Sequence, residues 1–119
     1  MMELNYIYNG EIGQFDYISI PKALFEDEKF AGLSVDAKIL YGLLLDKMSE
    51  STKNNWIDED GYVYIIYPIE EMLEDLNLSK RKTIDTLSEL DDIGLIDRRR
   101  QGRGNPNMIY VKNFNRPVC

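Results

Sequence analysis

The sequence contains no histidine and a single cysteine, Cys119, at its last position. These absences exclude an internal disulfide, a cysteine or histidine zinc site and the usual Ser-His and Cys-His nucleophiles. No apolar run approaches the roughly 18 residues that a membrane-spanning helix needs, and the first residues lack the charged and then apolar build of a signal peptide. We therefore expect a cytoplasmic protein with no metal, cofactor or membrane anchor.

Acidic residues are absent from the end of the chain. All 21 Asp and Glu residues lie at or before Asp97, whereas six of the 14 Lys and Arg residues follow it. The net charge is −7, but the segment after Asp97 carries +6 and the rest of the chain −13. A confined basic patch on an acidic body is typical of a protein that meets an anionic polymer with one face.

Caps, turns and periodicity predict four helices and three strands. Pro21, Ser34, Pro68 and Ser79 suit helix starts, because proline is tolerated in a first turn and a serine hydroxyl accepts a free backbone N–H. The expected helices are 22–25, 34–49, 68–76 and 80–93, and the expected strands are 61–67, 95–100 and 108–112. Residues 49–56 are expected to form a loop, and 58–61 a solvated acidic turn.

The first thirty residues predict extended structure. Asn9-Gly10 is a strong type I′ hairpin signal between 6–8 and the stretch 15–20. Exposed-looking aromatic residues are frequent in this β-arm, namely Tyr6, Tyr8, Phe15 and Tyr17. Two interpretations remain open, because these rings can either cover the core or belong to a strand that pairs with a second copy of the chain in a dimer.

Residues 68–112 predict a winged helix. Two helices joined by the short turn Asn77-Leu78 precede two strands with a Gly/Asn/Pro loop between them, which is the order of a helix-turn-helix with a β-hairpin wing. The expected fold class is therefore α+β, a winged helix with an N-terminal β-arm. The expected division is 1–30 for the arm and short helix, 31–114 for the core and 115–119 for a tail or the start of a linker.

The helix at 80–93 is the expected recognition helix. Its buried side is predicted from a spacing of three to consist of Ile84, Leu87, Leu90 and Ile93. Its outward side is predicted to consist of Arg81, Lys82, Asp85, Thr86 and Glu89. Basic residues in a first turn oppose the helix dipole by ~0.3–1 kcal/mol, and a DNA phosphate would offset that cost. The alternative is that they only balance acids on the preceding helix.

The segment 98–107 is the expected wing. Strand alternation places Arg98 and Arg100 on the parity of Ile96, and Asp97 and Arg99 on the other face. Positions that favour positive φ allow a tight tip, where Arg103 would probe a phosphate or the minor groove. The residues predicted to contact DNA are Lys80, Arg81, Lys82, Thr83, Thr86, Arg98, Arg99, Arg100, Arg103, Asn105, Asn107 and Lys112.

Several motifs between about Phe15 and Phe114 resemble one known family. They are IPKALF at 20–25, LSVDAKILYGLLLD at 33–46, WIDE at 56–59, VYII at 63–66, GLID followed by RRRQGRG at 94–104, and NMIYVKNF at 107–114. In this order they resemble the N-terminal domain of the RepA-type plasmid replication initiators of Gram-positive bacteria. The resemblance implies a winged helix that binds repeated sites of origin DNA as a dimer or higher assembly, and a C-terminal domain that engages host replication proteins.

We expect sequence-specific binding of double-stranded DNA at a plasmid or mobile-element replication origin. Two alternatives remain open, namely a transcriptional regulator that uses the same surface and an interaction module whose acidic body docks a basic partner. The scattered carboxylates form no catalytic constellation, so no enzyme is expected.

Overall fold

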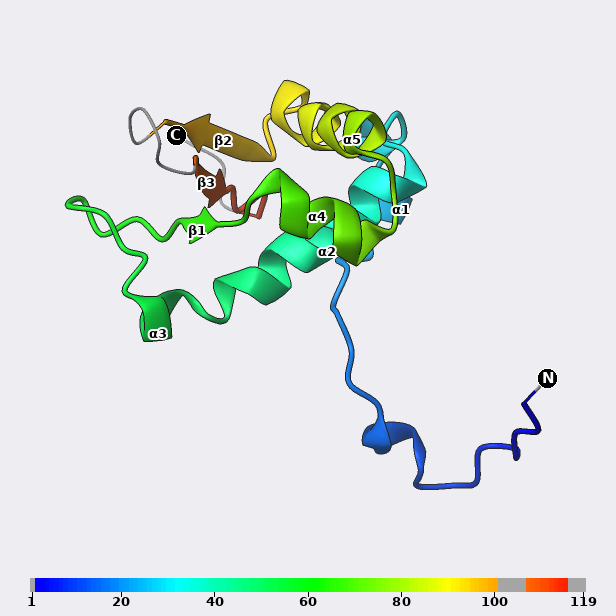
Figure 1. Cartoon of the computed structure of the whole chain (residues 1–119). Coiled ribbons are helices and arrows are strands. Elements are labelled where there is room, and N and C mark those ends of the chain that lie inside the picture. The colour runs from blue at the N-terminus through cyan, green and yellow to red at the C-terminus, as the bar shows by residue number, and fades with distance from the viewer. Residues whose placement is uncertain (1, 101–106, 116–119) are drawn as a thin grey trace.

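The computed structural model describes residues 2–100 and 107–115 (Figure 1). The helices in this part of the chain are α1 (Ala23–Glu26), α2 (Val35–Met48), α3 (Ser51–Asn54), α4 (Ile69–Leu76) and α5 (Lys80–Asp92), with 3-10 turns η1 (Ile12–Gln14) and η2 (Glu28–Phe30). The strands are β1 (Ile65–Ile66), β2 (Ile96–Arg99) and β3 (Met108–Val111). The expected α+β class is confirmed. None of the described helices has the length and apolar character needed to cross a membrane.

The three strands form an antiparallel sheet in the order β1-β3-β2. Ile65 pairs with Ile109 on one side of β3, and Ile96 pairs with Val111 on the other. The last strand of the chain is therefore the central one. The strand expected at 61–67 is confirmed only at Ile65–Ile66, because the residues before it turn back through a single bridge between Ile57 and Val63.

The core lies between α2, the α4–α5 pair and the sheet. Leu40 and Leu44 of α2 have no exposed surface, and neither have Ile65, Met72 and Leu90 from β1, α4 and α5. α2 packs against both α5 and β1, which explains why apolar residues occupy much of its circumference. α2 therefore occupies the central position that a helix with so many apolar residues requires.

Serine caps begin the two longest helices, as predicted. The Ser34 hydroxyl accepts the N–H of Ala37 at 3.1 Å, and the Ser79 hydroxyl accepts the N–H of Lys82 at 3.1 Å. Each bond satisfies one of the free donors of a first helical turn. Asn77, with a φ of 55°, ends α4 in the left-handed conformation and lets α5 begin three residues later.

The expectation of a loop at 49–56 is wrong over part of its length. Residues 51–54 form the single helical turn α3, which Asn55 ends with a φ of 58°. Ser51 is buried, and its carbonyl accepts the N–H of Trp56 at 2.8 Å. Packing of this one buried residue holds a helical turn that polar composition alone does not favour.

The N-terminal hairpin prediction is also wrong. The turn forms, because Gly10 has a φ of +91° and the Glu11 N–H donates to the Tyr8 carbonyl at 3.1 Å. However, residues 2–22 contain no strand, and the chain after the turn enters η1 instead. Tyr6 is 92% exposed and Tyr17 64%, so these rings do not cover the core. The arm extends away from the body of the molecule (Figure 1).

Gly42 marks the point where the arm meets the body. A Cβ atom at this position of α2 would lie 2.7 Å from Cγ1 of Ile20 and 3.2 Å from the carbonyl oxygen of Ser19. Such contacts are closer than van der Waals packing allows, so glycine is what lets residues 18–20 lie directly on the helix.

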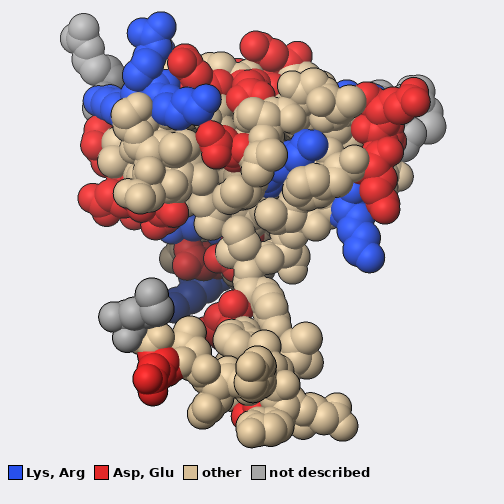
Figure 2. Space-filling model, turned by 90° about the vertical axis from the view of Figure 1, so that its right-hand side faces the viewer, with Lys and Arg blue, Asp and Glu red and all other residues tan. Residues whose placement is uncertain are grey.

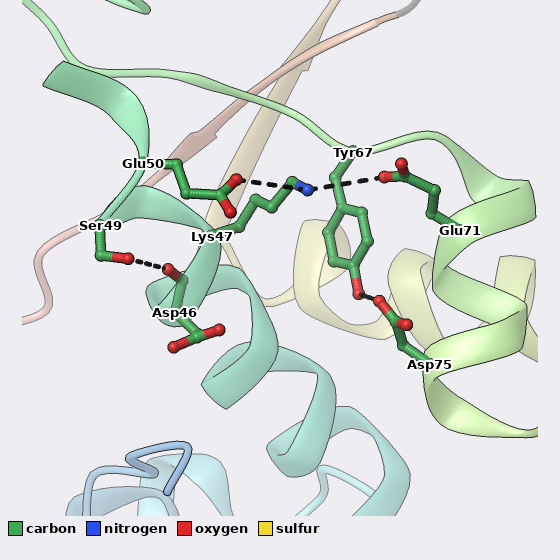
Figure 3. A network of polar contacts seen from close by, with 7 residues as sticks. All are labelled: Asp46, Lys47, Ser49, Glu50, Tyr67, Glu71 and Asp75. Atoms are coloured by element: carbon green, nitrogen blue, oxygen red, sulfur yellow. Dashed lines mark hydrogen bonds and ion pairs between the residues drawn. The ribbon is translucent and has the colours of Figure 1, made fainter. Parts of the chain in front are cut away.

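A polar network ties α2 to α4 (Figure 3). Nζ of Lys47 lies 3.4 Å from Glu50 and 3.6 Å from Glu71, and 5.3 Å above the ring of Tyr67. The Tyr67 hydroxyl donates to Asp75. Burial of the hydroxyl and its bond to Asp75 raise the pKa of Tyr67 far above its ordinary value. The network fixes α4, and α4 in turn supports α5.

Candidate nucleic-acid interface

The buried side of α5 differs from the predicted one. Thr83, Thr86, Leu87 and Leu90 are at most 2% exposed, whereas Ile84 is 38% exposed and Ile93 40%. The predicted spacing of three falls behind the helical repeat of about 3.6 residues, so that nine residues turn the helix by about two and a half turns. Ile84 and Ile93 therefore cannot share one side of the helix, and the prediction that both are core is wrong.

The predicted outward placement of Thr86 is wrong, and Thr83 is buried as well. The Thr83 hydroxyl donates to the Ser79 carbonyl at 2.8 Å, and the Thr86 hydroxyl donates to the Lys82 carbonyl at 2.7 Å. Both side chains have no exposed surface and satisfy their hydroxyls within the helix. Neither threonine therefore offers surface to a ligand.

The first turn of α5 exposes three basic side chains, Lys80, Arg81 and Lys82. Nζ of Lys80 lies 3.2 Å from Glu70 of α4, so the predicted alternative of balance by the preceding helix applies to this residue. Arg81 is 87% exposed, and its Nε lies 3.5 Å from Asp85 one turn later. On the face shown in Figure 2, basic side chains gather at one upper corner of the body beside acidic ones.

Glu89 faces α2 rather than solvent, which corrects its predicted outward position. Its carboxylate accepts the Ser34 N–H at 2.9 Å and the Ser34 hydroxyl proton at 2.7 Å. Ser34 thus caps α2 and holds the middle of α5 at the same time. This contact joins residues 55 positions apart, and no local pattern in the sequence indicates it.

Arg98 and Arg99 lie on opposite faces of β2, as the strand alternation predicts. Arg98 donates a hydrogen bond from Nε to Asp91, in the last turn of α5, at 2.9 Å, and its Nη2 forms an ion pair with the same carboxylate oxygen at 2.8 Å. This half-buried pair anchors the strand to the helix. Arg99 is exposed, its Nε lies 3.1 Å from Asp97, and its guanidinium lies 4.4 Å above the ring of Tyr110. The hydrogen bond to Asp97 raises the pKa of Arg99 above its ordinary value.

The acidic turn predicted at 58–61 is present but not merely solvated. One Asp58 oxygen accepts the N–H groups of Asp60 and Tyr62, each at 2.9 Å, and the other accepts the Tyr110 hydroxyl proton at 2.8 Å. Burial alone would raise the pKa of Asp58, but these hydrogen bonds outweigh it and lower the pKa below its ordinary value. Burial and the bond to Asp58 raise the pKa of Tyr110.

The remaining predicted residues are distributed along the hairpin. Arg100 and Asn107 are exposed at the end that leads into the connecting loop. Lys112 follows the other end of β3, where it lines a cleft together with Arg99 and Lys29. Arg103 and Asn105 lie outside the residues that the structure describes. The predicted cations in the described residues thus form two groups. One group, Lys80, Arg81 and Lys82, lies at the start of α5, and the other, Arg98, Arg99, Arg100 and Lys112, lies on or beside the strands of the hairpin.

Comparison with known proteins gives both sequence and structural relatives. Residues 16–118 match the family described as Replication initiator protein A (RepA) N-terminus. A 41 kDa protein of Lactobacillus helveticus is 34% identical over 97 residues, which make up 76% of this chain and 28% of that protein. The chain therefore spans less than a third of this relative's length.

Three solved structures share the fold. "N-Terminal domain of DNA binding protein" has a TM-score of 0.77 and 33% identity, and the match covers 98% of this chain and 87% of that one. "Structure of Rep-DNA complex" has a TM-score of 0.77 and 34% identity over 97% and 86% of the two chains. "Structure of MDR initiator" has a TM-score of 0.74 and 30% identity over 92% and 86%. With a family match over most of its length, this chain belongs to the N-terminal domains of the RepA replication initiators.

Proposed function

We propose that this domain binds double-stranded DNA at repeated sites of a plasmid or mobile-element replication origin. The observation that carries the proposal is the exposed basic first turn of α5, on a helix whose opposite side is fixed in the core. A helix N-terminus favours phosphate through its free N–H groups and its dipole. Membership of the initiator family and the likeness to a Rep-DNA complex support the same conclusion.

In this proposal the domain is a winged helix. α4 and α5 form the helix-turn-helix, and β2, β3 and the loop between them form the wing, with β1 as the third strand. The arm and short helix at 1–30 precede the core at 31–114. The proposed DNA contacts are Lys80, Arg81, Lys82, Arg99, Arg100, Arg103, Asn105, Asn107 and Lys112. Arg98 is proposed to hold the wing strand in place rather than to contact phosphate.

Two acids on the same surface shape how DNA would bind. Glu70 and Asp85 already pair with Lys80 and Arg81, so a phosphate has to replace a carboxylate partner at each position. Carboxylates repel the DNA backbone but can accept a hydrogen bond from the amino group of cytosine in the major groove. Asp85, exposed on α5, is therefore proposed to favour particular base pairs over non-specific DNA.

We propose that the N-terminal arm packs against a second copy of the domain. The arm exposes many large apolar side chains, among them Met2, Leu4, Tyr6, Ile7 and Tyr8. In Figure 2 it forms the lower lobe, most of which is neither acidic nor basic. Apolar surface of this extent on one segment is typical of an interface. A dimer would also match the repeated sites expected in origin DNA.

Analytical ultracentrifugation tests the dimer. The unaltered domain should sediment as a dimer, and replacement of Tyr6 and Ile7 by serine should shift it to the monomer, because each change removes apolar area from the interface. Lys53→Ala, on α3, is the control and should leave the dimer intact. A domain that stays monomeric at high concentration would rule out the arm as a dimer contact.

Origin recognition is the role proposed for this domain alone. Contact with host replication proteins, which the family resemblance implies for a C-terminal domain, is proposed to lie outside it. Because plasmid DNA lies in the cytoplasm, we propose that the domain acts there.

Fluorescence anisotropy tests DNA binding directly. The domain is titrated against fragments of its own gene and flanking DNA at several salt concentrations. We expect tight, competitor-resistant binding to one fragment that carries repeats, with a salt slope of about −0.9 for each phosphate neutralised. Lys82→Ala should weaken binding roughly tenfold at about 0.1 M salt and reduce the slope by about 0.9. Lys53→Ala removes the same charge from α3 and should change neither.

Three outcomes would count against the proposal. Equal losses from both lysine variants would show general charge attraction instead of a defined surface. Weak and equal binding to all fragments would remove sequence specificity, and no binding at low salt would remove DNA binding itself. Specific binding to one isolated palindrome near a promoter would instead indicate a transcriptional regulator.

A further inference from the structure

Three side chains from separate segments meet beside the wing strand. They are Arg99 of β2, Tyr110 of β3 and Asp58 of the turn that precedes β1. Tyr110 lies directly across from Asp97 in the β2–β3 register, and Asp97 is the residue that pairs with Arg99. The sheet itself therefore sets Tyr110 beneath the guanidinium.

Asp58 is a rigid acceptor for the Tyr110 hydroxyl. Its carboxylate is held by two backbone N–H groups of its own turn, those of Asp60 and Tyr62, and Gly61 allows that turn with a φ of +85°. The turn is further closed by the bridge between Ile57 and Val63. With both of its oxygens in use, Asp58 fixes the tilt of the Tyr110 ring.

An exposed arginine normally loses considerable rotamer freedom when it binds a ligand. Arg99 has lost part of that freedom already, because its Nε donates a hydrogen bond to Asp97 and its guanidinium lies over the ring of Tyr110. Among the residues described, its hydrogen bonds involve Nε alone, so both terminal nitrogens have no partner within the described part of the chain. These are the groups that form a fork with two phosphate oxygens.

We propose that Asp58 and Tyr110 are positioning residues, which hold Arg99 in the orientation that meets a DNA phosphate. The inference deepens the proposed function and rests on it. It gives the acidic turn a role, although a carboxylate near a DNA-binding strand would otherwise only repel the ligand. Asp58 acts through the tyrosine, and the tyrosine through the arginine.

A double-mutant cycle tests this chain of contacts on the specific DNA fragment. Tyr110→Phe removes one hydroxyl and keeps the ring, and we expect it to weaken binding about threefold by freeing Arg99. In the Arg99→Ala background the same change should have no effect, because the residue through which it acts is gone. Asp58→Asn should behave like Tyr110→Phe. Tyr64→Phe is the matched control, since its ring lies beside that of Tyr110 at 5.9 Å, and it should bind as the unaltered domain does.

Two outcomes of the cycle would overturn the inference. If Tyr110→Phe weakens binding equally with and without Arg99, the hydroxyl acts through the fold and not through the arginine. If Arg99→Ala weakens binding and Tyr110→Phe does not, Arg99 needs no positioning. Thermal unfolding of each variant, followed by circular dichroism, separates loss of contact from loss of folded protein.

A second measurement needs no DNA. The Nε–H signal of Arg99 in NMR spectra of the free domain should show an ordered side chain, and Tyr110→Phe and Asp58→Asn should each make it mobile. A mobile Arg99 in the unaltered domain would overturn the inference even where DNA binding is established. An ordered Arg99 in a domain that binds no DNA would overturn the proposed function instead.

Discussion

Arg98 and Arg99 are adjacent, identical in chemistry and opposite in surroundings. Arg98 turns toward α5 and forms a hydrogen bond and an ion pair with Asp91, while Arg99 lies exposed over the ring of Tyr110. A run of basic residues in the sequence therefore overstates the positive charge that a ligand can reach, because the fold uses part of it to hold itself together.

Among the residues that hold the fold together, Glu89 is expected to give the largest loss of stability when it is replaced. Glu89→Ala removes both hydrogen bonds to Ser34, and we expect the free energy of unfolding to fall by about 2 kcal/mol. Urea denaturation followed by circular dichroism measures this change. Glu74→Ala, an exposed position on α4, should alter the free energy by less than about 0.5 kcal/mol. Similar values for the two variants would show that the bond between α5 and α2 contributes nothing to stability.

Replacing single arginines of the run at 98–100 should change stability less than Glu89→Ala does, and it should separate anchoring residues from residues that contact DNA. Arg98→Ala should lower the free energy of unfolding by about 1 kcal/mol, because it breaks a half-buried pair and leaves Asp91 without its partner. Arg100→Ala, at an exposed position, should change stability by less than about 0.5 kcal/mol and weaken DNA binding roughly tenfold at about 0.1 M salt. Denaturation and anisotropy on both variants give the two readings. Variants that lose stability and affinity in the same proportion would erase the distinction between anchoring and contact.

Local chemistry made the helix boundaries predictable. Ser34 and Ser79 cap where expected, because a serine hydroxyl and the N–H three residues later need nothing from the rest of the chain. The Asn9-Gly10 turn forms for the same reason. The hairpin around it does not, because a turn cannot supply cross-strand packing, and the side chains on either side of it remain exposed.

The site was less predictable, because tertiary contacts decide it. The rotation of α5 depends on a 3.6-residue repeat that the apparent spacing of three misrepresents. The bond between Glu89 and Ser34 and the bond between Asp58 and Tyr110 join residues 55 and 52 positions apart. The outward placement of Arg81, Lys82 and Asp85 on α5 was predicted correctly. So was the strand alternation that separates Arg98 from Arg99, since the pleat of a strand fixes it without help from tertiary contacts.

Gly42 gives the N-terminal segment a recognisable mark in other sequences. A side chain at this position would collide with Ile20 and with the backbone at Ser19, so residues 18–20 could not follow the path they take here. In relatives that keep a glycine at the equivalent position, the segment can leave the body along the same line. In relatives with a larger residue there, the segment must take another route, and the arm would then project toward a different neighbour.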